Sequence, residues 1–185
     1  MKGVTLLVLA LGLLAPGAAA GGGVPEPAWL DRAGPVGQTG FCRAVGCQLV
    51  SVQVNGPDTV GWGNGTRRVY RAGAGWQLEL DVRPGGRVSG ARLLKPGAAR
   101  GTRLSPAEQR EAALFLQSLT GRRFTAQAVR ACMEAGLNAQ ARDPDVYGPA
   151  QPLSRWRTPG GVAFRARCGV AGAGPLGVWA GWQQG

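Results

Sequence analysis

The chain has 185 residues, with 21 Lys or Arg against 10 Asp or Glu and no histidine, so its formal net charge is +11. Without histidine, Ser-His-Asp and Cys-His catalytic sites are excluded, and so is the usual general base near neutral pH. No two cysteines have the Cys-x-x-Cys spacing of a zinc site, and we expect no metal ion and no cofactor.

The first twenty residues have the order of a secretory signal peptide. Lys2 supplies a positive charge, an apolar run follows from Val4 to Leu14, and three alanines end at Ala20. The run is about a dozen residues, whereas a helix that spans a bilayer needs about twenty, so a retained membrane anchor is the less favoured alternative. We predict cleavage near Ala20 and a secreted or periplasmic protein, without a stable membrane span.

Composition divides the remaining chain into two parts. Gly21 to Gly40 is rich in Gly and Pro and has no periodicity, which predicts a flexible leader. Residues 41–185 are long enough to form a single domain with its own core. Removing the signal segment takes away one lysine and no acidic residue, so the rest of the chain stays strongly basic.

All four cysteines fall in this domain, and their even number predicts two disulfides in an oxidising compartment. Four cysteines allow three pairings. We prefer Cys42–Cys47, which closes a short local loop, together with Cys132–Cys168, which would join a helix to the inward face of a strand.

Alternating apolar and polar residues predict strands in the first half of the domain. Trp76 to Val82 has the clearest alternation, and Cys47 to Val54 and Thr66 to Arg71 are further candidates. A three-residue loop at Pro84-Gly85-Gly86 would pair Val82 with Val88 and Leu80 with Gly90.

Two helices are predicted in mid-chain. The first begins at Ser105-Pro106-Ala107-Glu108, which has the residues of a capping box, and it stops at Thr120-Gly121. The second runs from Thr125 to Gly136, and Asn138 to Leu153 is expected to be a loop. A second hairpin around Pro159-Gly160-Gly161 and a last strand from Leu176 to Trp182 follow. This order predicts an α+β fold, an antiparallel sheet of hairpins with two short helices packed on one face.

The second hairpin yields the candidate binding site. Its register places four arginines on the face opposite the apolar side chains: Arg155, Arg157, Arg165 and Arg167. Like charges side by side on a sheet repel one another unless an anion lies across them. Solvent screening or acidic side chains from elsewhere in the fold would also relieve this repulsion.

Tryptophans add a second set of candidates. We expect Trp76, Trp156 and Trp182 to pack in the core because they share faces with aliphatic residues. Trp62 and Trp179 are the better surface candidates, where an indole ring can stack on a ligand or meet an arginine.

These patterns favour a non-enzymatic binding domain whose basic face engages an anionic envelope polymer or a nucleic acid. The alternative explanation of the charge is a GC-rich coding composition. A structural or interaction protein with a protein partner is the second hypothesis. A hydrolase is the third, because Glu79 and Asp81 lie about 7 Å apart on one strand face, a spacing that an acid/base pair can use. The alternative explanation of the two carboxylates is that they belong to the solvated face of an amphipathic strand.

Overall fold

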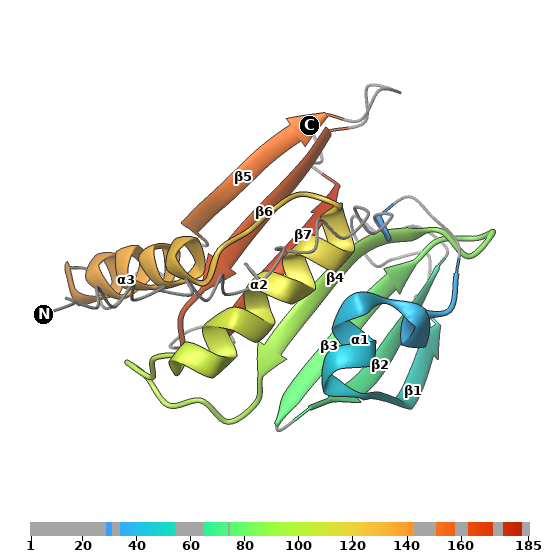
Figure 1. Ribbon diagram of the computed structural model, residues 1–185, viewed down its shortest axis with the longest axis horizontal. Coiled ribbons are helices and arrows are strands. Elements are labelled where there is room, and N and C mark those ends of the chain that lie inside the picture. Colours follow the sequence, from blue (N-terminus) through green and yellow to red (C-terminus); the bar gives the residue numbers. More distant parts are fainter. Residues whose placement is uncertain are drawn as a thin grey trace, which may run out of the picture.

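The computed structural model describes residues 29–30, 34–54, 65–73, 75–142, 151–157, 163–171 and 176–182. They form one seven-stranded antiparallel sheet with helices on one face, which confirms the predicted α+β fold (Figure 1). The strands are β1 (Cys47–Val54), β2 (Thr66–Ala72), β3 (Trp76–Val82), β4 (Val88–Lys95), β5 (Gln151–Arg157), β6 (Ala163–Gly169) and β7 (Leu176–Trp182). The predicted signal peptide, residues 1–20, lies outside the described residues. Among the described helices, none has the length and apolar character needed to cross a membrane.

The strands follow a different order in space than along the chain. They lie side by side as β1-β2-β3-β4-β7-β6-β5. Strands β1 to β4 pair with their chain neighbours, as do β5 to β7, and the two sets meet where β7 pairs with β4. β1 and β5 are therefore the two edges of the sheet.

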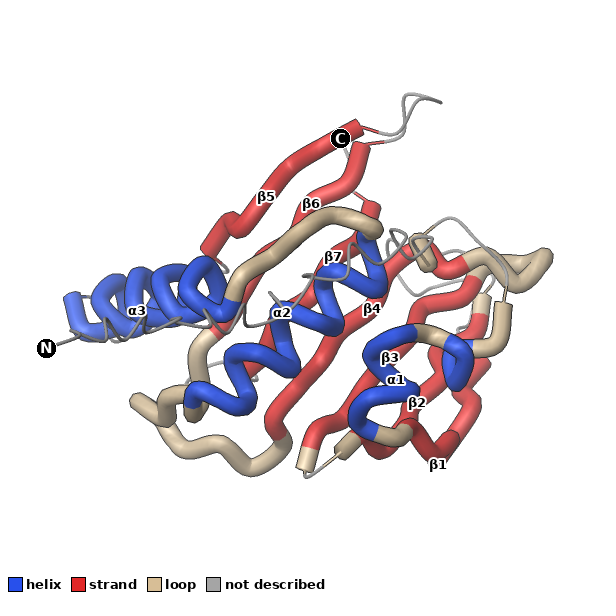
Figure 2. Tube along the Cα trace, in the orientation of Figure 1, coloured by secondary structure: helices blue, strands red, loops and turns tan. Residues whose placement is uncertain are grey.

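Three α-helices cover one face: α1 (Gly40–Val45), α2 (Pro106–Thr120) and α3 (Ala126–Arg142) (Figure 2). α2 begins with the predicted capping box. The Ser105 hydroxyl accepts a hydrogen bond from the Glu108 N–H, and the Glu108 carboxylate accepts one from the Ser105 N–H. α2 ends at Gly121, whose φ of 67° is the left-handed conformation that glycine adopts at low cost.

The second predicted helix is longer than we expected. We predicted that Gly136 ends it, but α3 continues to Arg142. Gly136 is buried, and a Cβ atom at this position would lie 3.0 Å from Val170 Cγ1. The glycine therefore permits close packing and does not end the helix. The predicted loop from Asn138 to Leu153 is wrong at both ends, since β5 already begins at Gln151.

Part of the predicted leader packs on the domain. The N–H groups of Trp29 and Leu30 both donate to the Leu119 carbonyl, and both side chains are buried. The Trp29 indole meets Phe115 edge-on, with ring centroids 6.5 Å apart. The flexible segment expected from Gly21 to Gly40 does not include these described residues, because their apolar side chains cover the core.

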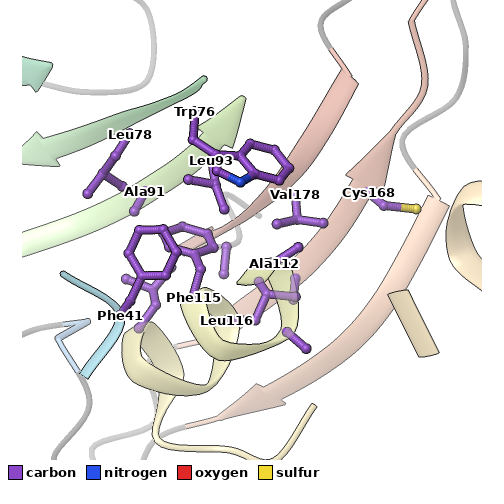
Figure 3. Close-up of a cluster of buried hydrophobic side chains, with 14 of the residues drawn as sticks. Phe41, Trp76, Leu78, Ala91, Leu93, Ala112, Phe115, Leu116, Cys168 and Val178 are labelled. Carbon is purple, nitrogen blue, oxygen red and sulfur yellow. The ribbon is translucent and has the colours of Figure 1, made fainter. Parts of the chain in front are cut away.

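The core lies between the sheet and the helices (Figure 3). Phe41 of α1 and Phe115 of α2 pack edge-to-face, with ring centroids 5.5 Å apart. They lie over the apolar side of β3 and β4, where Leu93 is fully buried. Trp76 is buried as predicted, and its indole N–H donates to the Glu111 carboxylate at 2.6 Å, so the buried donor has a partner.

Both preferred disulfides are present. Cys42–Cys47 joins α1 to the start of β1 across a sequence separation of 5, and Cys132–Cys168 joins α3 to β6 across a separation of 36. The described residues contain no free cysteine. The longer bridge attaches the helical layer to the sheet.

The β3–β4 hairpin departs from the predicted register through a β-bulge. The pair next to the loop, Val82 with Val88, forms as predicted. Leu80, however, pairs with Ala91 and not with Gly90. Ser89 is the extra residue of the bulge. In the predicted register, Arg92 would share the buried face with Leu80, and the bulge turns it to the opposite face.

Candidate anion-binding face

One face of the sheet carries none of the described helices, and we call it the basic face. Its side chains alternate along each strand with those that enter the core. Strand pairing places its charged and aromatic residues in adjacent positions. They are Arg67, Arg71, Glu79, Asp81, Arg92, Arg155, Arg157, Arg165, Arg167 and Trp179.

On β2 to β4 the two acids of this face pair with Arg67 and Arg92, while Arg71 is exposed near the β1 edge. Arg67 Nε lies 2.9 Å from Asp81 Oδ1, and Arg92 reaches both acids, with 3.2 Å to Glu79 and 3.3 Å to Asp81. Only 2% of the Asp81 side chain is exposed. The two carboxylates are thus acceptors in an ion-pair network, so they are not part of the solvated strand face that we considered, and this geometry lends no support to the acid/base role.

On β6 the charges of Arg165 and Arg167 are not compensated in this way by the described acidic residues. The predicted register is confirmed, since Arg155 lies directly opposite Arg165, and Arg157 lies opposite Ala163. Side chains opposite one another on antiparallel strands have Cβ atoms about 5 Å apart, so the first pair brings two like charges together. Among the described residues, no acidic side chain forms an ion pair with Arg165 or Arg167.

Arg167 is the most constrained member of the group. It pairs with Trp179 on β7, and its guanidinium lies over the indole ring, 5.5 Å from the centroid. Its Nε atom is buried and has no hydrogen-bond partner. Burial, and the positive charges of Arg165 and Arg92, lower the pKa of Arg167. A cation in this position is stabilised when an anion approaches it.

Arg92 belongs to the site, although sequence reasoning did not include it. It lies directly opposite Trp179 on the other side of β7, so the indole has an arginine on each neighbouring strand. The bulge at Ser89 determines this placement. Alternation along β4 was the only available signal, and it pointed to the wrong face because a one-residue bulge leaves no clear pattern in the sequence.

Glycines flank Trp179 along its own strand. Gly177 and Gly181 share its face, and Gly181 pairs with Gly90 on β4 and with Arg165 on β6. A Cβ atom at Gly177 would lie 2.1 Å from the Leu93 carbonyl oxygen, so no other residue fits there without backbone movement. Between Arg165 and Gly90 of β4, the basic face therefore has a glycine in place of a larger side chain.

The structure describes only some of the tryptophans that were predicted as site or core residues. Trp62 lies outside the described residues. Trp179 is partly buried, and Trp156 stacks on Phe164 toward the helices, with ring centroids 5.8 Å apart. In the described part of the chain, no three His, Cys, Asp or Glu side chains are grouped so that they could hold a metal ion.

No protein-family model matches this chain, and no curated protein or solved structure matches it either.

Proposed function

We propose that the protein is a secreted or periplasmic, non-enzymatic binding domain that holds an anionic polymer, an envelope polymer or a nucleic acid, on the β5–β6–β7 part of its basic face. The supporting observation is Arg167, a partly buried arginine whose buried Nε has no acceptor and whose charged neighbours are Arg165 and Arg92. A phosphate or carboxylate group beside Arg167 supplies the acceptor that its Nε lacks and a counter-charge for Arg165 and Arg167.

The extended arrangement of charge favours a polymer over a single small anion. Arg155 and Arg165 continue the cationic surface from Arg167 toward the β5 edge, while the acids of the face are already engaged with Arg67 and Arg92. Two disulfides are compatible with an oxidising compartment outside the cytoplasm. Cleavage near Ala20 is part of this proposal, and the intact mass of mature protein from the native host tests it.

A salt titration of binding tests the proposed function. Affinity for a single-stranded DNA oligonucleotide and for an acidic glycan is measured as ionic strength rises, and the logarithm of the binding constant should fall linearly with the logarithm of salt concentration. Replacing Arg165 and Arg167 by Gln should make the slope shallower by about 1.5, since each neutralised contact contributes roughly 0.7 to 0.9.

Two arginines on the helical side provide a matched control. Arg110 and Arg123 are exposed in α2 and just after it, so replacing both by Gln removes the same charge from the other face. This control should retain the wild-type slope. The proposal is wrong if the wild-type protein binds neither polymer at low ionic strength, or if both double variants lose the same slope. Far-ultraviolet circular dichroism checks that each variant is folded.

A further inference from the structure

The edge strand β1 differs from the rest of the molecule in its charge. All eight residues from Cys47 to Val54 are uncharged, in a chain that has 31 charged residues in total. Four of these side chains are large, apolar and exposed: Leu49 by 51%, Val50 by 58%, Val52 by 53% and Val54 by 82%. The described residues contain no other large hydrophobic side chains with this exposure.

The opposite edge of the sheet has the features that prevent association. β5 contains Pro152, which has no N–H to offer a further strand, and it carries Arg155 and Arg157. β1 contains neither proline nor charge, and its single bulge, at Val50, leaves four paired positions from Ser51 to Val54 unbroken. One edge is therefore protected against further pairing and the other is not.

We infer that β1 pairs with β1 of a second copy of this chain, antiparallel about a two-fold axis perpendicular to the sheet. Such an axis reverses the strand direction and keeps the same face upward, so two seven-stranded sheets become one continuous sheet. Leu49, Val52 and Val54 pair with the β2 residues Tyr70, Arg68 and Thr66, which places all three on the same face. The two copies bring these side chains together and remove them from water.

Charge favours a second copy over a different protein. A different protein that bound this strongly basic chain through electrostatic attraction would be acidic. Cations on the edge strand would be needed to bind it, and β1 has none. In an isologous contact any cation on the strand occurs twice along the paired edge, and an uncharged strand avoids the resulting repulsion. On the basic face of β2, Arg67 is already paired with Asp81, and Arg71 lies opposite Gln48, an uncharged residue of β1.

Sedimentation equilibrium of the full mature chain tests this inference. Protein concentration is varied from about 1 to 300 µM, which covers the affinities expected of a small interface. The wild-type protein should change from monomer to dimer over this range. Val52→Lys should raise the dimer dissociation constant by at least about tenfold, because two lysines are brought into the paired edge. Val54→Lys should act in the same direction.

The matched control places the same charge elsewhere. Gln127→Lys adds a lysine at an exposed position of α3 and should leave the dimer intact. Hydrogen exchange at high and at low concentration provides a second measurement, in which β1 amides should be protected only in the dimer. A wild-type protein that stays monomeric over this range overturns the inference. If its β1 amides then exchange freely, the edge is open to a different protein. If they are protected, another segment of this chain covers the edge.

Discussion

Arg167 and Trp179 occupy directly paired positions on β6 and β7, and the guanidinium lies over the indole ring at 5.5 Å from its centroid. The ring attracts the cation through its π electrons, but it offers no acceptor to the buried Nε. Trp179 therefore holds the guanidinium in place without neutralising it.

Replacing Trp179 with Leu should weaken polymer binding about two- to fivefold at every salt concentration, which corresponds to the 0.5–1 kcal/mol of one cation–π contact. The salt slope should not change, since the number of cations is the same. Trp156→Leu is the control, because that ring also holds an arginine, Arg122, at 5.5 Å but stacks on Phe164 toward the helices. Equal loss of affinity in both variants would contradict a specific role for Trp179.

Asp81→Asn should lower the free energy of unfolding by about 2 kcal/mol or more, because it leaves Arg67 and Arg92 without their most buried counter-ion. Urea denaturation measures the change. Glu134→Gln is the control, since Glu134 pairs with Arg130 at an exposed site and should contribute less than about 0.5 kcal/mol. A similar small loss in both variants would show that burial of Asp81 does not strengthen its ion pairs.

The two disulfides should contribute unequally to stability. Loop-closure entropy assigns about 4 kcal/mol to a loop the size of Cys132–Cys168 and about 2 kcal/mol to one the size of Cys42–Cys47. Replacing Cys132 and Cys168 by Ala should therefore lower the unfolding free energy more than replacing the other pair. Chemical denaturation of the two double variants decides this, and the reverse order would contradict it.

Acid should remove a contribution of Glu108. Burial raises the pKa of its carboxyl group, but hydrogen bonds from Lys95 and Ser105, with the charge of Lys95, lower it by more, so the pKa lies below its ordinary value of 4.5. A lowered pKa stabilises the fold above the unfolded value, and this stabilisation is lost as pH falls through the folded value. Glu108→Gln should cost about 0.5–1 kcal/mol at pH 7. Below pH 4.5, the unfolding free energy of the Glu108→Gln variant should also fall less steeply with pH than that of the wild type. Parallel pH curves for the two proteins would contradict this assignment.

Sequence alone predicted those parts of the fold where local chemistry and periodicity agree. Trp76 to Val82 alternates cleanly, and Ser105 with Glu108 specifies the start of a helix, so β3 and α2 were predicted correctly. Gly136 was misleading, because glycine ends helices and also permits close packing, and only the position of Val170 distinguishes the two.

Part of the candidate anion-binding face was also predicted from local sequence patterns. The arginines of β5 and β6 follow from one hairpin register, which is local information. The positions of Arg92 and Trp179 beside them depend on β7 lying between β4 and β6, and on the bulge at Ser89. Neither feature has a local signature, since pairing between segments distant in sequence is decided by the whole core.

The central place of β7 has a consequence for the order of assembly. Of the described strands, it is synthesised last, yet it provides the pairing between β4 and β6 that makes the two parts one sheet. Until Leu176–Trp182 has arrived, the outer sides of β4 and β6 have unpaired backbone groups and α2 has an incomplete apolar surface to cover. A chain that passes through a narrow translocation pore from its N-terminus would thus keep this sheet incomplete until β7 had crossed.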